Sequence, residues 1–201
     1  MDLDRFIEER VTKPLGMSST GFYVREADRD RLAQPQIDPA TGKRPPLFDA
    51  TQKPKLFSGG GGGVSTASDY LSFCEMLLHG GTLGNTHLLS QATINLMTSN
   101  ALKSGIGYSA ATLQRFGDIG PTPAMGQGFG LGFAVRTEPG QNPLPGSTGS
   151  FYWTGAYGTT FFVDSKLQLI IIMMIQVPLP AAPFYRHEIR YLTYQALSAS
   201  D

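Results

Sequence analysis

The sequence predicts an α+β fold in which an antiparallel sheet packs against helices. Residues 159–163 and 167–177 are rich in β-branched and aromatic side chains, with Asp164-Ser165-Lys166 between them. Such a pattern predicts a β-hairpin with a short turn. Helical patterns come before the strands rather than alternating with them, which favours α+β over a parallel sheet. We expect one domain over 1–201, with 1–125 mostly helical and irregular and 126–201 holding the strands and a closing helix.

The first element expected is a short amphipathic helix. Leu3, Phe6, Ile7 and Val11 recur at helical spacing, and the helix should stop near Pro14. A second short helix is expected over residues 26–34. Five prolines follow, at positions 35, 39, 45, 46 and 54, and they predict an irregular excursion.

A longer helix should begin after the five glycines at 59–63. Thr66 is placed to cap its N-terminus, and Asp69, three residues on, completes a capping-box pattern. Apolar residues at helical spacing predict its buried face: Leu71, Cys74, Leu77 and Leu78. Gly80-Gly81 should end it. Ser90 is expected to cap a further helix through Met97.

Three strands and a closing helix are expected in the last part of the chain. The strands are Phe129–Val135, Thr159–Val163 and Leu167–Val177. The third is apolar on both faces, so it should lie inside the sheet with both faces covered. Phe184–Leu197 should form a helix that packs on one face.

Composition excludes several classes of partner. Sixteen basic residues balance sixteen acidic ones, so no field attracts nucleic acid or an anionic membrane. The longest apolar run, Leu169 to Ile175, is too short to span a bilayer. No signal peptide follows Met1, which favours the cytoplasm without fixing the compartment. The single Cys74 cannot form an internal disulfide and reads as an inert core residue.

Four motifs occur in an order that resembles one family. They are Pro-Leu-Gly-Met-Ser-Ser-Thr at 14–20, Gly-Gly-Val-Ser-Thr-Ala-Ser-Asp-Tyr at 62–70, Gly-Phe-Gly-Leu-Gly-Phe at 128–133 and Trp-Thr-Gly-Ala-Tyr-Gly-Thr at 153–159. Together they resemble the class C β-lactamase superfamily of penicillin-recognising serine hydrolases. The last motif is most similar to the third active-site box of the family VIII carboxylesterases, where Trp-Gly-Gly replaces the Lys-Thr-Gly of the lactamases. The resemblance implies a β-lactamase/transpeptidase-like fold and acyl-enzyme hydrolysis of a small ester or lactam.

Two other boxes of that family do not occur in these 201 residues. No serine is followed three residues later by lysine, which rules out a Ser-x-x-Lys nucleophile within this sequence. Tyr108-Ser109-Ala110 lies too late, and lacks the asparagine, to be the Tyr-x-Asn box. We therefore expect a C-terminal half that is inactive alone and completed by an N-terminal half. An exposed sheet edge would also allow self-association.

The resemblance implies roles for the residues of the third box. The backbone N–H of Ala156 would be the second oxyanion donor, and Gly155 would let the backbone approach the acyl group. Trp153 would form an apolar wall that favours neutral esters. Thr154 departs from Trp-Gly-Gly and matches the lactamase threonine, and Tyr157 would border the substrate. Without the resemblance, Trp153 and Tyr157 read as core aromatics.

Alternatives remain at the levels of site and function. Ser147-Thr148-Gly149 has the form of a third box, but a loop is the better interpretation. His79, His87 and His187 are expected on the surface or at caps, with no metal site and no cofactor. A non-catalytic binding module is the main functional alternative. An independent enzyme with another nucleophile is the weaker one, because Gly-x-Ser-x-Gly does not occur.

Overall fold

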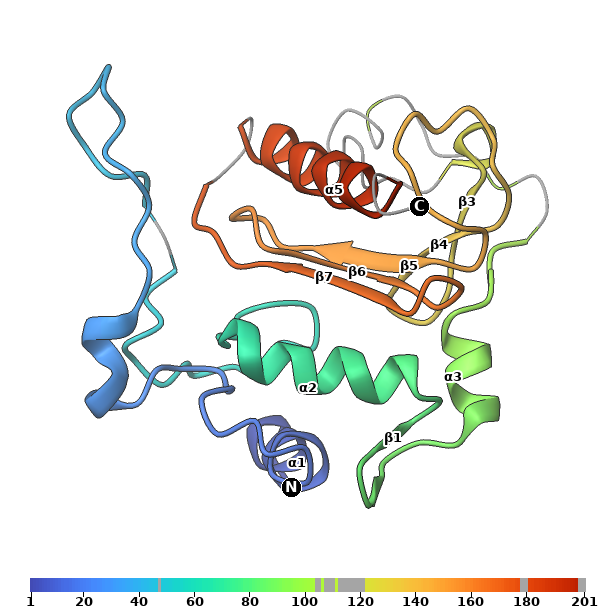
Figure 1. Cartoon of the computed structure of the whole chain (residues 1–201). Helices are drawn as coiled ribbons and strands as arrows, with labels where there is room; N and C mark the ends of the chain where they lie inside the picture. The colour runs from blue at the N-terminus through green and yellow to red at the C-terminus, as the bar shows by residue number, and fades with distance from the viewer. Residues whose placement is uncertain (47, 104–105, 107–110, 112–121, 178–180, 199–201) are drawn as a thin grey trace.

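The computed structural model describes all residues except 47, 104–105, 107–110, 112–121, 178–180 and 199–201. Its described part is layered: one helix covers the upper face of an antiparallel sheet and another covers the lower face (Figure 1). The sheet has the order β3-β4-β5-β6-β7. The strands are β3 Gln127–Phe129, β4 Ala134–Arg136, β5 Phe151–Thr154, β6 Thr160–Asp164 and β7 Leu169–Met173. This arrangement confirms the expected α+β class.

The N-terminal helix forms, but it changes geometry along its length. α1 spans Leu3–Ile7 and continues as a π-helical turn, η1, over Glu8–Thr12, so the helical segment ends before Pro14 as expected. The helix expected over 26–34 is only the 3-10 segment η2, Glu26–Arg31. The backbone is already extended at Leu32. Beyond it the proline-rich chain extends away from the sheet, at left in Figure 1.

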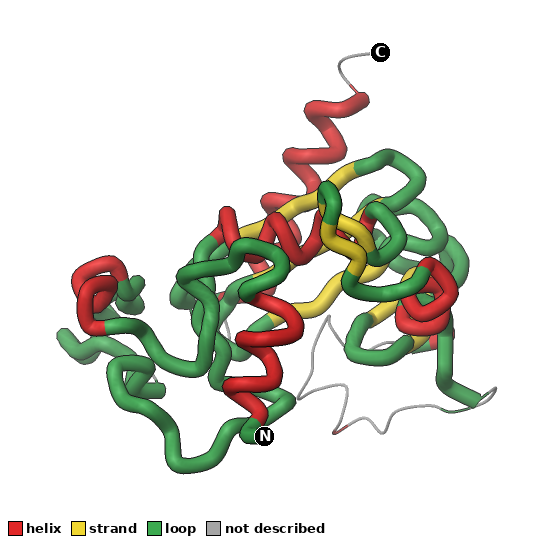
Figure 2. The backbone as a smooth tube through the Cα atoms, turned by 90° about the horizontal axis from the view of Figure 1, so that it is seen from below, coloured by secondary structure: helices red, strands yellow, loops and turns green. Residues whose placement is uncertain are grey.

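Thr66 caps the N-terminus of helix α2, Ala67–Leu78, as expected. Thr66 accepts a hydrogen bond from the backbone of Asp69 at 3.2 Å. The other half of the expected capping box, in which the Asp69 side chain reaches back to the N-cap backbone, is wrong. Instead, the Asp69 carboxylate accepts from the backbone of Ser19 at 2.7 Å and from the hydroxyl of Thr20 at 2.9 Å. Asp69 therefore ties the Pro-Leu-Gly-Met turn to α2. Seen from below, this N-terminal layer lies in front of the strands (Figure 2).

Between α2 and the next helix lies a short hairpin that was not predicted. Its strands are β1 Thr82–Leu83 and β2 Thr86–His87. Helix α3 then spans Gln91–Met97, and Ser90 caps it by accepting from the backbone of Thr93, as expected.

The single strand expected over Phe129–Val135 is wrong, because this segment folds back on itself. β3 and β4 are antiparallel, and Gly130 N–H donates to the Phe133 carbonyl at 2.8 Å across the turn between them. Gly132 adopts a φ of 93°, which only glycine adopts readily. A side chain at Gly130 would lie 2.0 Å from the Met97 carbonyl, so the turn packs against the end of α3.

The hairpin β6–β7 is confirmed, whereas the expected position of β7 inside the sheet is wrong. β7 pairs only with β6 among the described strands, so it forms an edge of the sheet. Its faces are covered as expected, with contacts to α2 on one side and to α5, Ala182–Ser198, on the other. An apolar pattern reports which faces of a strand are buried; it says nothing of whether a second strand pairs alongside.

Two hydrophobic clusters follow from the alternation of side chains along the strands. On β6, Phe161 and Val163 belong to the cluster between the sheet and α2, and Phe162 belongs to the cluster between the sheet and α5. On β5, Phe151 and Tyr152 divide in the same way. β5 is therefore fixed from both sides by packing, which positions its C-terminal end.

Candidate functional site

The C-terminal end of β5 is paired on one side only. β5 pairs with β6 from Phe151 to Thr154, but its pairing with β4 stops at Tyr152. Beyond Tyr152 its other edge has no strand partner among the described residues. Trp153 and the residues that follow it therefore border an open edge of backbone, and most of the expected site residues lie there.

A tight turn follows the strand and leaves backbone N–H groups without an acceptor among the described residues, that of Ala156 among them. Gly155 N–H donates to the Thr159 carbonyl at 2.8 Å, and Gly158 N–H donates to the Gly155 carbonyl at 3.1 Å. Gly158 has a φ of 101°, which allows the chain to reverse. Ala156 is exposed, and its N–H has no acceptor among the described residues. An exposed, unpaired N–H at a strand end can bind a ligand oxygen.

Gly155 packs closely against the side chain of Thr159. A Cβ at this position would lie 2.3 Å from the Thr159 hydroxyl oxygen, closer than two such atoms can approach. The glycine therefore makes room for Thr159 within the turn. Close approach to an acyl group, the reason expected from the sequence, stays a prediction.

Trp153 is half-buried and packs in part as a core aromatic. Its ring stands edge-on against Phe129 of β3, with 5.2 Å between the ring centroids and 74° between the planes. Tyr157 is also half-buried, and its carbonyl accepts from Val177 N–H at 2.7 Å. The ring of Trp153 thus packs against β3, and the backbone of Tyr157 ties the turn to the segment that follows β7.

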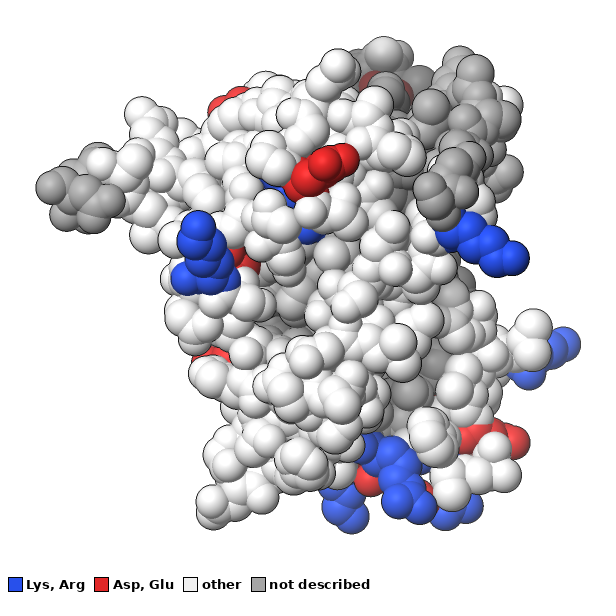
Figure 3. Space-filling model, turned by 90° about the vertical axis from the view of Figure 1, so that its right-hand side faces the viewer, with Lys and Arg blue, Asp and Glu red and all other residues white. Residues whose placement is uncertain are grey.

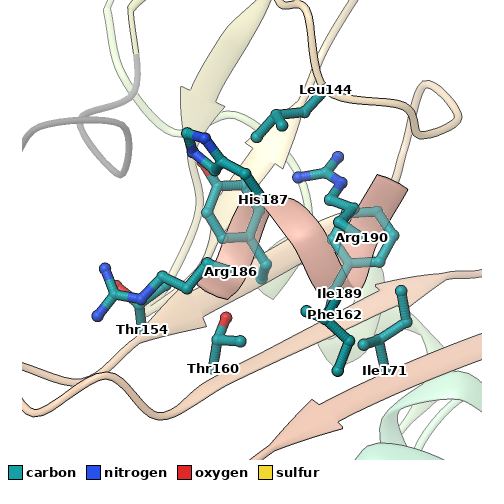
Figure 4. Close-up of a pocket in the computed structure, with 10 residues that line it drawn as sticks. Leu144, Thr154, Thr160, Phe162, Ile171, Arg186, His187, Ile189 and Arg190 are labelled. Atoms are coloured by element: carbon teal, nitrogen blue, oxygen red, sulfur yellow. The ribbon is translucent and has the colours of Figure 1, made fainter. Parts of the chain in front are cut away.

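Thr154 lies on the opposite face of β5 from Trp153, because successive side chains alternate along a strand. It is buried, and its hydroxyl has no partner within the described part of the chain. The side chain lines a cavity of about 30 Å³ between the sheet and α5, together with Thr160 and Arg186 (Figure 4). That volume can hold an ordered water molecule, which would satisfy the hydroxyl.

Arg186 of α5 contacts the motif at 153–159, and sequence reasoning did not single it out. Its Nη2 donates to the Gly155 carbonyl at 2.6 Å, and the side chain lies beside Thr154 in Figure 4. One helical turn later, Arg190 donates to the Pro145 carbonyl at 2.6 Å and lies 4.0 Å over the Phe162 ring. Burial lowers the pKa of Arg190 to about 10, so it remains charged at neutral pH. In the sequence, these two residues are marked only weakly, as arginines four positions apart on a helix that is expected to face the sheet.

Asp164, at the end of β6, joins three segments that surround the strand. Its carboxylate accepts from Ser147 N–H at 2.9 Å, from the Tyr194 hydroxyl at 2.5 Å, and from the backbone of Lys166 and Leu167 at 3.2 Å each. Burial alone would raise the pKa of Asp164, but these hydrogen bonds outweigh it and hold the pKa below its usual value. Burial, together with the hydrogen bond to Asp164, raises the pKa of Tyr194.

The other residues considered for a site have structural contacts of their own. Ser147-Thr148-Gly149 lies in the loop before β5, as expected, where Ser147 binds Asp164. His79 caps the C-terminus of α2 and contacts the Glu75 carbonyl. Burial raises the pKa of Cys74 to about 12, so this thiol is inert. Among the residues that the structure describes, no cluster of His, Cys, Asp and Glu could hold a metal ion. Tyr108-Ser109-Ala110 lies outside the described residues.

The surface agrees with the balanced composition. On the face shown in Figure 3, lysine and arginine are scattered or mixed with acids at the lower edge, with no continuous basic stripe. In the described ranges, no helix is both long and apolar enough to cross a membrane.

Comparisons with known proteins agree on one family. The Beta-lactamase family model matches residues 1–194. Protein Rv1367c of Mycobacterium tuberculosis strain H37Rv is 37% identical over 180 residues, which cover 87% of this chain and 43% of that protein. Esterase EstB of Burkholderia gladioli is 28% identical over 176 residues, covering 84% of this chain and 42% of EstB.

A solved structure gives the same answer for the fold. EstCE1, described as a hydrolase with promiscuous acyltransferase activity, has a TM-score of 0.74 and 27% identity, covering 96% of this chain and 50% of its own. This chain thus spans half or less of the length of these three relatives. The match over nearly all of its length shows that the chain belongs to the beta-lactamase family and has the β-lactamase/transpeptidase-like fold.

Proposed function

We propose that this chain is the C-terminal half of a carboxylesterase-type serine hydrolase. It supplies the third active-site box and one oxyanion donor, while a complementary segment supplies the nucleophile. The observation that carries the proposal is the free, exposed N–H of Ala156 at the open end of β5. The absence of Ser-x-x-Lys from these 201 residues assigns the nucleophile to the other segment.

The chemistry assigned to the site is acyl transfer through a covalent intermediate. Attack of a serine on an ester carbonyl places negative charge on its oxygen, and backbone N–H groups aimed at that oxygen stabilise it. Removing one such donor typically costs about 2.7–4 kcal/mol. Ala156 would be one donor and the N–H of the nucleophile the other. Trp153 would contact the acyl or alcohol group as an apolar wall, which favours neutral esters over charged lactams.

We assign the docking site of the complementary segment to the β7 edge and the adjoining face of α5. Among the described strands, β7 has no partner on the side away from β6. On α5, Leu192 and Leu197 are exposed, and with Met173 of β7 they line an open groove. Unpaired strand edges and contiguous apolar surface both favour a protein partner. We propose that the complementary N-terminal half occupies this surface, because this chain covers only 50% of EstCE1.

The test compares the chain alone with the chain co-expressed with the N-terminal half of a family member that carries Ser-x-x-Lys. Substrates are p-nitrophenyl acetate, butyrate and octanoate, and a fluorophosphonate probe reports the reactive serine. The chain alone should show neither turnover nor labelling; the pair should show both, with the label on the partner. Turnover by the purified chain with one of its own serines labelled stoichiometrically would refute the proposal.

Oligomeric state is measured on the same samples by light scattering coupled to size exclusion. A one-to-one complex that forms only with the N-terminal half supports the assigned docking site. A homodimer that excludes that half would show self-association through the β7 edge instead, and would contradict the assignment.

Trp153 is tested in the complemented enzyme. Trp153→Ala should change the relative kcat/KM for the three esters by removing an apolar wall, with fluorophosphonate labelling unchanged. If Trp153→Ala leaves all three substrates unaffected, the third box is misplaced, and Ser147-Thr148-Gly149 becomes the next candidate.

A further inference from the structure

We propose that Arg186 is a positioning residue that orients and polarises the oxyanion donor, an inference that rests on the proposed function. Its guanidinium binds the Gly155 carbonyl at 2.6 Å. That carbonyl belongs to the same peptide unit as the N–H of Ala156. A residue of the C-terminal helix would thus act on the donor through a single peptide bond.

Peptide geometry makes the connection direct. The Gly155–Ala156 peptide is planar, and its C=O and N–H point in opposite directions. Fixing the direction of the carbonyl therefore fixes the direction of the N–H. The carbonyl also accepts from Gly158 N–H at 3.1 Å, within the turn. Two donors from different segments hold one end of the peptide and leave the other end free to bind an oxygen.

Arg186 is itself held by a well-anchored helix. Its relative exposure is only 8%, and it projects from α5 toward the sheet (Figure 4). One and two turns later, Arg190 binds the Pro145 carbonyl and Tyr194 binds Asp164. The stripe at 186, 190 and 194 thus fixes α5 against the loop before β5 and the end of β6. A guanidinium on such a helix is preorganised and needs little rearrangement during a reaction.

The charge of Arg186 also affects the strength of the donor. A charged donor makes a stronger hydrogen bond than a neutral one, and it polarises the peptide that accepts it. Each hydrogen bond in a chain can strengthen the next by roughly 10–30%. The N–H of Ala156 would therefore bind a developing oxyanion more tightly than it binds a neutral carbonyl. The expected signature is a loss in kcat with little change in KM.

The kinetic test uses the complemented enzyme. Arg186→Gln should lower kcat on the order of tenfold with KM nearly constant, since it weakens one oxyanion donor without removing it. Arg186→Lys, which retains the charge, should recover part of the loss. Arg190→Gln is the matched control: it removes a similarly buried arginine from the same helix, one that binds the Pro145 carbonyl instead of Gly155, so it should lower stability and change kcat far less than Arg186→Gln. Equal kcat in Arg186→Gln and wild type would overturn the proposal.

A second readout needs no activity and uses the isolated chain. In ¹⁵N-labelled protein, Arg186→Gln should shift the amide nitrogen of Ala156 upfield, because the Gly155 carbonyl of the same peptide loses a donor. Arg190→Gln should move that signal far less. An Ala156 amide that does not respond to Arg186→Gln would overturn the orientation claim. If the complemented wild-type enzyme is inactive, the proposed function fails, and the amide shift still decides whether Arg186 orients this peptide.

Discussion

Asp164→Ala should destabilise the chain strongly, because the carboxylate is fully buried and accepts four hydrogen bonds. The two donors in the β6–β7 turn, at Lys166 and Leu167, belong to exposed residues that water can reach. The Ser147 N–H and the Tyr194 hydroxyl belong to half-buried residues and would lose their acceptor. At about 1–3 kcal/mol for each buried donor left unpaired, the expected cost is about 4 kcal/mol.

The measurement is urea unfolding at 25 °C, with thermal melts as a second assay. For a chain of this size, a loss of that order lowers Tm by roughly 8–16 °C. Tyr194→Phe is the matched variant, because it removes one donor while keeping the acceptor and the ring; it should cost about 1.5–3 kcal/mol. A loss below about 1 kcal/mol for Asp164→Ala, well under any buried unpaired donor, would refute the reasoning.

The same carboxylate predicts a pH dependence. Its pKa in the folded chain lies below its usual value, and the pKa of an unfolded aspartate is about 3.9. Its contribution is therefore fully present above the unfolded pKa and is lost as the pH falls through the folded pKa. Wild type should lose stability faster than Asp164→Asn as the pH falls below about 4. Parallel curves for the two proteins would contradict the assigned shift.

Three further outcomes follow from local geometry. Gly155→Ala should cost about 1–3 kcal/mol in thermal melts, because its Cβ would meet the Thr159 hydroxyl, and adding Thr159→Ala should restore most of the loss; no recovery would show that the clash lies elsewhere. Thr66→Ala should cost about 1 kcal/mol in urea by removing the N-cap of α2, and an unchanged midpoint would argue against the cap. Native Cys74, with its raised pKa and complete burial, should resist iodoacetamide at pH 8 and react in urea; rapid native labelling would contradict this.

The elements that the sequence predicts well are those specified by neighbouring residues. The caps at Thr66 and Ser90 depend on contacts within three residues, and both are confirmed. The hairpin β6–β7 depends on a turn between two apolar runs, and it is confirmed as well. Local hydrogen bonds and local alternation leave a direct pattern in the sequence, so such elements can be read without knowing the rest of the fold.

The incorrect predictions concern contacts between distant segments. Asp69 has the position of a capping-box partner, but the Ser19 and Thr20 turn, 50 and 49 residues earlier, binds its carboxylate instead. The turn at Gly130 divides an expected strand because it packs against the end of α3. In both cases the local pattern permits two arrangements, and a distant neighbour selects one of them.

The contact of Arg186 with Gly155 shows why a candidate site is harder to predict than a fold. Arg186 and Arg190 bind backbone carbonyls 31 and 45 residues away. Every residue has a carbonyl, so the acceptor leaves no trace in the identity of Gly155 or Pro145. A motif can locate Ala156, because a turn needs glycine at fixed places around it. The guanidinium behind its peptide becomes visible only when α5 is laid across the sheet, since the constraint on Arg186 is the distance from helix to strand.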